Sequence, residues 1–191
     1  MIGFADEVWW SRLVQPNLQS WSAATDALRL CEKTIGTDDP DPKALACYGV
    51  LLRATPTIVE QIWLRFATGQ PVSGLTTQFL AWCGDTLAAL GTKAWLLVWD
   101  NASWHTSQAV RRWIRTHNRT VKEQRQGVRI VACLLPVKRP WLNPIAPPWL
   151  HGKRAVLEAE RLLPAAEVET RVYAYYGCEP ESHLVIPEQA A

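Results

Sequence analysis

The chain has 191 residues, which is long enough for one well-buried domain and too short for two comfortable ones. No apolar run approaches the roughly 20 residues of a membrane span, and the chain does not open on the Arg- or Lys-led apolar segment of a signal peptide. The five cysteines are odd in number and form no CxxC pair, which argues against a disulfide framework and against a zinc site. Together these features predict a single domain that is soluble and intracellular.

Charge is unevenly divided along the chain. The net charge is +2, yet residues 111–154 hold eleven Lys and Arg against a single acid, Glu123, and the remainder of the chain is acidic. A basic block beside an acidic remainder favours an anionic partner for one face, and nucleic acid is the commonest such partner. The alternative is a basic helix face that is only solvated.

The first predicted element is a strand that contains an acid. Residues 1–18 predict a strand through Asp6 and then a second strand, which ends at Pro16. A carboxylate inside an apolar strand is costly to bury unless it is paired or binds a metal, so Asp6 is a candidate metal ligand. An exposed position at a sheet edge is the alternative for Asp6. Residues 37–42, rich in Asp and Pro, predict a loop.

Three more strands and a helix follow this loop. Residues 44–52 and 58–66 predict strands, and residues 73–90 have the apolar spacing of a helix that stops at Gly91. The six apolar residues 94–99 fit a strand that is buried on both faces, as in a sheet covered by helices.

This apolar run ends at Asp100. In open α/β sheets, ligands gather just outside the carboxyl ends of strands, so Asp100 occupies a position where such sheets place their chemistry. Asn101, Ser103 and His105 follow within hydrogen-bonding reach of a turn. The alternative is that Asp100 and Asn101 only turn the chain, as Asp and Asn often do.

The next predicted element is a helix with a basic face. Thr106 can cap this helix, His117 falls on its apolar stripe and is expected as a core histidine, and Gly127 ends it. A row of basic residues follows a second face of the helix, where it is either solvated or laid along a phosphate backbone. The members of this row are Arg111, Arg115, Arg119 and Lys122.

One strand and two helices complete the prediction. Residues 128–135 are a nearly continuous apolar run and predict a strand. After a proline-stiffened loop, Pro147–Pro148 suit the first turn of a helix that continues to Leu163, and a last helix is expected over residues 165–176.

The order of these motifs resembles a known family. An Asp in the first strand, the strand end WDNASWH, the loop LPVKRPWLNPI and the following HGKRAV are similar to the bacterial insertion-sequence branch of the Tc/mariner transposases, which are DDE-type enzymes. The resemblance implies an α/β, ribonuclease-H-like fold, with a mixed five-stranded sheet flanked by helices. It also implies a single catalytic domain over residues 1–191, which lacks the helix-turn-helix DNA-binding region that related enzymes carry ahead of the core and is therefore a fragment or truncated product.

The resemblance assigns the acids of the catalytic triad. It implies that Asp6 and Asp100 are the first two acids and that both bind Mg²⁺ or Mn²⁺, while the place of the third, a glutamate after the Asn-Pro-Ile of the loop, is taken by Ala146. Phosphodiester chemistry of this kind uses two divalent ions. Two carboxylates offset too little of the positive charge of these ions to hold the second ion firmly. We therefore expect Asp6 and Asp100 on neighbouring strands, with their carboxylates within about 8 Å of each other.

No other acid of the sequence is expected to replace the missing glutamate. Glu158 and Glu160 would lie about 18 Å along a helix from Ala146 at 1.5 Å per residue. Glu7 points to the opposite face of its strand from Asp6. His105 and His151 are softer ligands, better suited to zinc, and are expected in supporting or structural roles.

The resemblance implies that the chain is the catalytic domain of a cut-and-paste DNA transposase, which performs metal-dependent strand cleavage and strand transfer, impaired by Ala146. The main alternative is a non-catalytic DNA-binding or self-associating remnant that modulates an intact transposase. An unrelated α/β hydrolytic enzyme is a third. The candidates for supporting the acids are Asn101, His105 and Asn143, and those for binding DNA are Arg111, Arg115, Arg119, Lys122, Lys138, Arg139, Lys153 and Arg154.

The implied partners are transposon-end and target DNA and a second copy of the chain, without a membrane or a small-molecule substrate. The implied location is the bacterial cytoplasm, at the nucleoid when the protein is bound to DNA.

Overall fold

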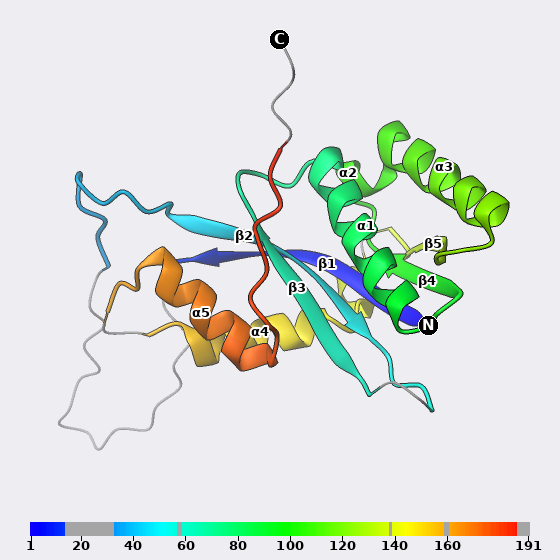
Figure 1. Cartoon of the computed structure of the whole chain (residues 1–191). Coiled ribbons are helices and arrows are strands. Elements are labelled where there is room, and N and C mark those ends of the chain that lie inside the picture. Colours follow the sequence, from blue (N-terminus) through cyan, green and yellow to red (C-terminus); the bar gives the residue numbers. More distant parts are fainter. Residues whose placement is uncertain (14–32, 57–58, 138, 159–160, 187–191) are drawn as a thin grey trace, which may run out of the picture.

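The computed structural model describes residues 1–13, 33–56, 59–137, 139–158 and 161–186. Its centre is a five-stranded mixed sheet in the order β3-β2-β1-β4-β5 (Figure 1). The antiparallel part consists of β1 (Ile2–Ser11), β2 (Ala44–Leu52) and β3 (Gln61–Ala67). The parallel part adds β4 (Ala94–Trp99), which pairs with β1, and β5 (Arg129–Leu134), which pairs with β4.

Helices cover both faces of the sheet (Figure 1). One face packs against α1 (Ser73–Ala89) and α3 (Gln108–Gln124), with the single-turn α2 (Ser103–Thr106) before α3. The other face packs against α4 (Ala146–Val156) and α5 (Ala165–Tyr176). A 3-10 turn, η1, spans Pro140–Leu142 ahead of α4.

The alternation of side chains along β1 decides which layer each residue faces. Val8 and Trp10 belong to the apolar cluster under α4 and α5, whereas Ala5 belongs to the cluster under α1 and α3. Because successive residues of a strand point to opposite faces, Asp6 faces the α4 side and Glu7 faces the α1 side.

The structure corrects the prediction for the start of the chain. Residues 2–11 form one continuous strand instead of two, because β1 stays paired with β2 from Gly3 through Ser11, past Asp6. Pro16, the expected end of the second strand, lies outside the described residues. The loop predicted at residues 37–42 is confirmed.

The prediction that residues 94–99 are buried on both faces is wrong. Trp95, Leu97 and Trp99 are buried, but Leu96 and Val98 on the other face are only half-buried. The strand predicted at residues 128–135 also forms, as β5, but every residue of β5 except Ile130 is exposed. On the face of Leu96 and Val98, the physical reason is that α4 and α5 cover β1, β2 and β3 and leave β4 and β5 open. Ala132 and Leu134, which pair with Leu97 and Trp99, are exposed on the other face.

Two helix boundaries also differ from the prediction. Ser107, not Thr106, caps α3, and its hydroxyl accepts a hydrogen bond from the Val110 amide at 3.2 Å. The helix predicted to continue to Leu163 ends at Val156, because Leu157 adopts an extended backbone. The boundaries predicted for β2 and β4 are confirmed, as are α5 and, to within one residue, α1.

A buried arginine joins three segments beyond the end of β1. Arg12 is 3% exposed. Its guanidinium contacts the Asp39 carboxylate at 2.7 Å and donates through Nε to the Leu163 carbonyl at 2.7 Å. The Asp41 carboxylate accepts a hydrogen bond from the Ala165 amide, at the start of α5. This arrangement fixes the loop before β2 and the segment before α5 against the end of β1.

No helix in the described part of the chain is both long and apolar enough to cross a membrane.

Candidate active site

The structure places Asp6 on β1 and Asp100 directly after β4, the parallel neighbour of β1. The pairing of β1 with β4 runs from Ile2 opposite Leu96 to Phe4 opposite Val98. Asp6 lies two residues beyond Phe4 and Asp100 two residues beyond Val98, so the two acids follow the last paired positions in the same register. The carboxyl ends of parallel strands meet at one edge of a sheet, and this is the edge at which α/β folds collect functional groups.

Asp6 lies in an environment that disfavours its charge. Burial, followed by the negative charges of Glu7 and Asp100, raises the pKa of Asp6 from 3.8 to about 7. The Glu7 amide donates a hydrogen bond to Asp6 Oδ1 at 3.0 Å, which partly offsets these effects. The electrostatic influence of Asp100 on Asp6 is consistent with the proximity expected from the sequence, while the separation of the two carboxylates stays a prediction.

Asp100 is held by two donors on a single oxygen. Asp100 Oδ1 accepts a hydrogen bond from the Ala102 amide at 2.9 Å and contacts His105 Nδ1 at 2.8 Å. The hydrogen bond with His105 is the main cause that holds the pKa of Asp100 below its ordinary value. The hydrogen bond from the Ala102 amide closes a local turn, which is the alternative role that the sequence predicts for Asp100. Asp100 therefore both turns the chain and presents a carboxylate.

His105 connects Asp100 to Glu7 on the other side of the sheet. His105 is 2% exposed, and its Nε2 lies 2.8 Å from Glu7 Oε1. Its ring stacks on Trp99 with centroids 4.5 Å apart. Burial alone would lower the pKa of His105, but the hydrogen bonds with Asp100 and Glu7 outweigh it and raise the pKa to about 9.

Asn143 attaches the loop before α4 to the strand that carries Asp6. Asn143 is 3% exposed, and its Nδ2 donates to the Ala5 carbonyl at 3.0 Å. Its Oδ1 is buried and has no hydrogen-bond partner among the described residues. The Ala146 amide donates to the Asn143 carbonyl at 3.0 Å, and Ala146 is the first residue of α4. The helix α4 therefore begins, at Ala146, about one turn after Asn143, which is hydrogen-bonded to Ala5, the neighbour of Asp6 in β1.

Lys153 differs from the other basic candidates. It is half-buried, and its pKa is lowered by burial while the negative charge of Asp6 acts to raise it. The charge of the Asp6 carboxylate thus acts on the ammonium group of Lys153, which lies on α4 two turns after Ala146. That Lys153 contacts DNA stays a prediction.

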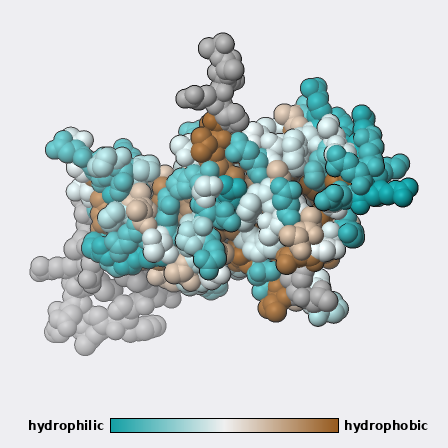
Figure 2. Space-filling view, in the orientation of Figure 1, coloured by the Kyte–Doolittle hydropathy of each residue, from teal (hydrophilic) through white to brown (hydrophobic). Residues whose placement is uncertain are grey.

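The remaining basic candidates that the structure describes are exposed. Figure 2 shows the hydrophilic surface that covers α3, the helix that carries the predicted basic row. Arg139 is exposed and lies over the ring of Trp141, 5.0 Å from its centroid. Lys138 lies outside the described residues. The exposed candidates are Arg111, Arg115, Arg119, Lys122, Arg139 and Arg154.

Several oxygen atoms at this edge are of the kind that a divalent cation binds. Asp6 and Asp100 each keep an oxygen, Oδ2, without a hydrogen bond from any described residue, and the buried Asn143 Oδ1 is a further unpaired oxygen beside β1. Hard cations such as Mg²⁺ and Mn²⁺ prefer oxygen ligands of this kind. No group of three or more His, Cys, Asp and Glu side chains in the described ranges is arranged to hold a metal ion.

The other sequence candidates have structural partners. Asn101 Nδ2 donates to the Leu135 carbonyl at 2.6 Å, which joins the ends of β4 and β5. His117 Nε2 lies 2.8 Å from the Val128 carbonyl, and the ring stacks on Trp113, in agreement with a packing role. His151 is exposed.

Glu158 is engaged in ion pairs of its own. Glu158 does not lie on a helix that continues from Ala146, because α4 ends at Val156. Its carboxylate is part of an ion-pair cluster with Arg161 and Arg171, away from the acids. Glu160 lies outside the described residues.

Sequence reasoning missed two contributors to this site, Glu7 and Lys153. Glu7 was correctly expected to point away from Asp6, but its contact with His105 depends on the return of the chain in α2. Trp104, also on α2, donates through Nε1 to Glu7 Oε2 at 3.0 Å. Asp6 influences Lys153 electrostatically because α4 packs against β1.

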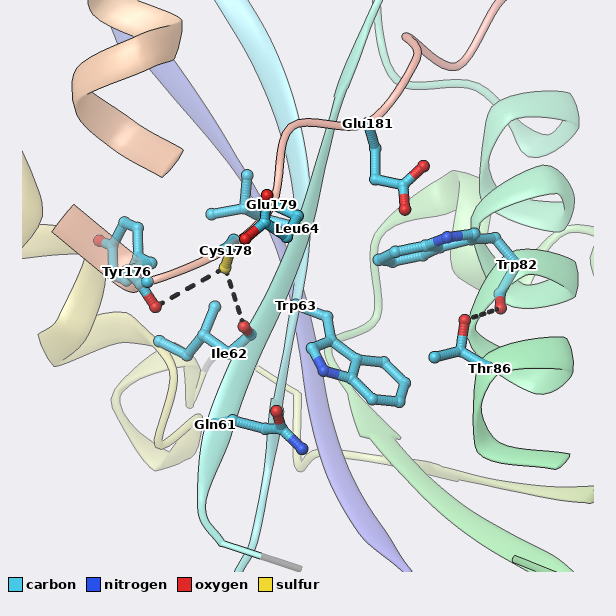
Figure 3. A pocket seen from close by; sticks show the side chains of 11 residues that line it. Gln61, Ile62, Trp63, Leu64, Trp82, Thr86, Tyr176, Cys178, Glu179 and Glu181 are labelled. Atoms are coloured by element: carbon cyan, nitrogen blue, oxygen red, sulfur yellow. Dashed lines mark hydrogen bonds between the residues drawn. The ribbon is translucent and has the colours of Figure 1, made fainter. Parts of the chain in front are cut away.

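A cavity of about 300 Å³ lies beside β3, the outer strand of the sheet (Figure 3). It is bounded by β3, by Trp82 and Thr86 of α1 and by the segment from Tyr176 to Glu181. The Cys178 thiol donates to the Ile62 carbonyl at 3.0 Å on its floor. Because β2 and β3 separate this cavity from Asp6, it is not part of the acidic centre.

The sequence matches the family described as "DDE superfamily endonuclease" over residues 70–168, about half of the chain, and the chain belongs to that family. No curated protein matches the sequence. With the sheet order described above, this membership establishes a ribonuclease-H-like fold of the kind found in DDE catalytic cores.

Solved structures of one transposase share the fold. The chain is similar to "Mos1 transposase paired-end complex with left transposon end" with a TM-score of 0.62 and 14% identity, covering 93% of this chain and 48% of that one. It is similar to "Crystal structure of the Mos1 mariner paired end complex with Mn" with a TM-score of 0.61, 14% identity and the same coverage. "Crystal structure of the Mos1 Strand Transfer Complex" gives a TM-score of 0.57 and 15% identity, over 93% of this chain and 47% of that one. The chain thus spans about half the length of these structures.

Proposed function

We propose that the chain is the catalytic domain of a cut-and-paste DNA transposase whose acidic centre holds one divalent ion and is impaired in DNA cleavage. The observation that carries this proposal is the position of Asp6 and Asp100 in one register on neighbouring parallel strands of a DDE-family fold, with Ala146 at the start of α4. The sheet brings two carboxylates to one edge, and the third position of the family pattern offers only a methyl group.

In this proposal the chain holds Mg²⁺ or Mn²⁺ through Asp6 and Asp100, each of which has one oxygen without a protein donor. An ion bound there would supply stabilisation of the negative charge that develops on the attacking and leaving oxygens of the phosphodiester. The manganese in a Mos1 structure of the same fold supports this choice of ion.

The protein's own residues prepare the site for a phosphate. His105 and the Ala102 amide fix Asp100 by hydrogen bonds to one oxygen, and Asn143 fixes the loop that starts α4. Lys153, on which the charge of Asp6 acts, is proposed to offset part of the charge of that carboxylate when no metal is bound. The same ammonium group opposes the binding of a second cation, in addition to the loss of the glutamate.

We propose that duplex DNA binds through the exposed basic surface of α3 together with Arg139 and Arg154. Binding through phosphates is independent of sequence and steeply dependent on salt. Transposon ends and target DNA are the proposed partners, with a second copy of the chain in the assembly, because the similar solved structures are transposase complexes described with transposon ends or strand transfer. The proposal includes a bacterial insertion-sequence origin and action in the cytoplasm at the nucleoid, which rest on the WDNASWH and PWLNPI motifs.

A second function is favoured by Ala146 and Lys153 together. A DDE domain that lacks its third acid and keeps a lysine beside the first can bind DNA, or associate with an intact transposase, without cleaving. Such a protein would modulate transposition by occupying transposon ends.

A nicking assay with supercoiled DNA and Mn²⁺ tests the proposed function. We expect little nicking by the natural chain and more by Ala146→Glu, because a glutamate at the first position of α4 adds a ligand where the helix dipole favours a negative charge. Asp100→Asn, placed in both backgrounds, is the matched control and should abolish the activity.

Equal nicking by both proteins, abolished in both by Asp100→Asn, would show that another group completes the site and that the centre is not impaired. Normal DNA binding by Ala146→Glu without any nicking would favour the non-catalytic function.

A further inference from the structure

Glu7 lies on the face of the sheet opposite Asp6 and is connected to Asp100 through His105. Both nitrogens of the His105 ring contact carboxylate oxygens at 2.8 Å, Nδ1 with Asp100 and Nε2 with Glu7. Ionised carboxylates only accept hydrogen bonds, so both ring nitrogens must donate. The ring therefore has a single orientation that satisfies both partners, because a rotation about its bonds breaks at least one of these hydrogen bonds.

Glu7 is itself fixed by two donors. Its Oε1 accepts from His105, and its Oε2 accepts from Trp104 Nε1 at 3.0 Å. The side chain of Glu7 is 9% exposed and that of His105 is 1% exposed, so water does not compete for these bonds. Trp99 covers one face of the His105 ring by stacking at an interplanar angle of 11°. The imidazole is thus held from its edge and from its face.

Asp100 is the exposed end of this series of hydrogen bonds. Its side chain is 41% exposed and follows the last residue of β4, where an unsupported carboxylate would sample several rotamers. His105 restrains it through Oδ1, and Oδ2 is the oxygen left without a donor among the residues described. The orientation of Oδ2 consequently depends on the position of the ring, and the position of the ring depends on Glu7.

We propose that Glu7 is a positioning residue for Asp100, acting through His105 from the opposite face of the sheet. This inference rests on the proposed function only in that Asp100 is taken as the metal ligand. Glu7 does not touch the metal or the DNA. It fixes the imidazole, and the imidazole fixes one oxygen of Asp100 so that the other oxygen is directed to the cation before the cation binds. Partners of this kind, which hydrogen-bond the groups around a metal ligand, typically change metal affinity by about 10–100-fold when they are removed.

The first readout is Mn²⁺ affinity of the full chain without DNA, measured by electron paramagnetic resonance of free Mn²⁺. We expect Glu7→Gln to weaken binding by at least about 10-fold, because glutamine keeps the shape but cannot accept from both His105 and Trp104. Trp104→Phe removes only the bond to Glu7 Oε2 and should weaken binding less. Glu60→Gln, at an exposed surface ion pair with Arg53, is the matched control and should leave the affinity unchanged.

A double-mutant cycle separates positioning from a general loss of structure. If Glu7 acts through Asp100, Glu7→Gln should have no further effect on Mn²⁺ affinity in an Asp100→Asn background. An equal decrease in both backgrounds would overturn the proposal, because it would mean that Glu7 acts on the site by another route.

The second readout does not require a metal. In ¹⁵N-labelled protein, the His105 Nδ1 proton bonded to Asp100 should give a slowly exchanging signal in the natural chain. This signal should disappear or broaden in Glu7→Gln, although the bond itself does not involve Glu7. An unchanged signal in the variant would refute the positioning role whether or not Mn²⁺ binds. Loss of the signal in the variant, together with no Mn²⁺ binding by the natural chain, would uphold the positioning role and refute the proposed metal site instead.

Discussion

Asp6→Asn should stabilise the metal-free protein, and the gain should depend on pH. The pKa of Asp6 is raised from 3.8 to about 7, chiefly by burial and then by the charges of Glu7 and Asp100. Between these two pH values the folded chain keeps the proton that the unfolded chain releases, so the stability contributed at Asp6 falls as the pH rises. Above about pH 7 the carboxylate is charged in both states, and the folded state carries the full unfavourable effect.

The magnitude follows from the size of this change in pKa. At about 1.4 kcal/mol for each pH unit, a rise of about three units corresponds to an upper bound of about 4 kcal/mol at pH 8. Partial contact of Asp6 with solvent reduces this figure, and we expect a gain of about 2–3 kcal/mol for Asp6→Asn. Asparagine can still accept the hydrogen bond from the Glu7 amide, so the substitution removes mainly the charge.

The assay is urea unfolding in EDTA at pH 8, 6 and 4.5, with both proteins measured at each pH. The difference in unfolding free energy between Asp6→Asn and the natural chain should be largest at pH 8 and should shrink toward pH 4.5. Asp85→Asn makes the same chemical change at an exposed position on α1 and should alter stability by less than about 0.5 kcal/mol at every pH. A gain from Asp6→Asn that is absent at pH 8, or constant from pH 8 to 4.5, would refute the electrostatic description of the site.

Two further predictions concern DNA binding and the fold. Replacing Arg111, Arg115 and Arg119 by Ala should weaken duplex binding and reduce the slope of log affinity against log salt by about 0.9 for each phosphate that the protein no longer neutralises. Arg161→Ala, in the ion-pair cluster with Glu158 and Glu167, is the control, and an unchanged slope in the α3 variant would show that the basic face of α3 is only solvated. Arg12→Met should cost about 3–5 kcal/mol in urea unfolding, because it removes the cationic partner of the Asp39 carboxylate and the donor to the Leu163 carbonyl. Arg53→Met at the surface should cost little, and similar effects of the two substitutions would contradict this account.

Periodicity and turn chemistry predict β2 to β5 and most helices, but they divide β1 into two strands. The nine residues of β2 and the six of β4 were predicted with both ends because Pro, Asp or Gly punctuates the chain near them. The same reasoning failed for burial. An apolar run such as β5 does not say whether a helix will cover it, and here α4 and α5 lie over β1, β2 and β3 instead.

Asp6 and Asp100 are candidates in the sequence because each interrupts or ends an apolar strand, and the family resemblance adds His105 as a candidate for supporting them. The contact of His105 with Asp100 agrees with that candidate role, but its contact with Glu7 could not be predicted. His105 is separated from Glu7 by 98 positions, and only the parallel pairing of β4 with β1 brings α2 over Glu7. Lys153 is one basic residue among eleven in residues 111–154, and no pattern distinguishes it from a surface residue until α4 is placed against β1.

Placing a glutamate at position 146, the proposed place of the third acid, should destabilise the metal-free protein and increase the stabilisation by Mn²⁺. A carboxylate at position 146 adds a like charge near Asp6, which at an effective dielectric constant of about 20 and a separation of roughly 8 Å is worth about 2 kcal/mol. A favourable interaction with the N-terminus of α4 offsets about 0.3–1 kcal/mol of this. Ala146→Glu should therefore be about 1 kcal/mol less stable than the natural chain at pH 8 in EDTA.

With 1 mM Mn²⁺ the order should reverse, because an ion that binds only the folded state stabilises it by RT ln(1 + [L]/Kd), about 2.7 kcal/mol when the ion is at 100 times its Kd. Thermal unfolding with and without Mn²⁺ measures both effects, and Ala146→Gln is the matched control, since it has nearly the shape of Glu but adds no charge. Equal stabilisation of the natural chain and of Ala146→Glu by Mn²⁺ would mean that position 146 does not face the cation. In that case the place of the third acid in this chain would lie elsewhere than the start of α4.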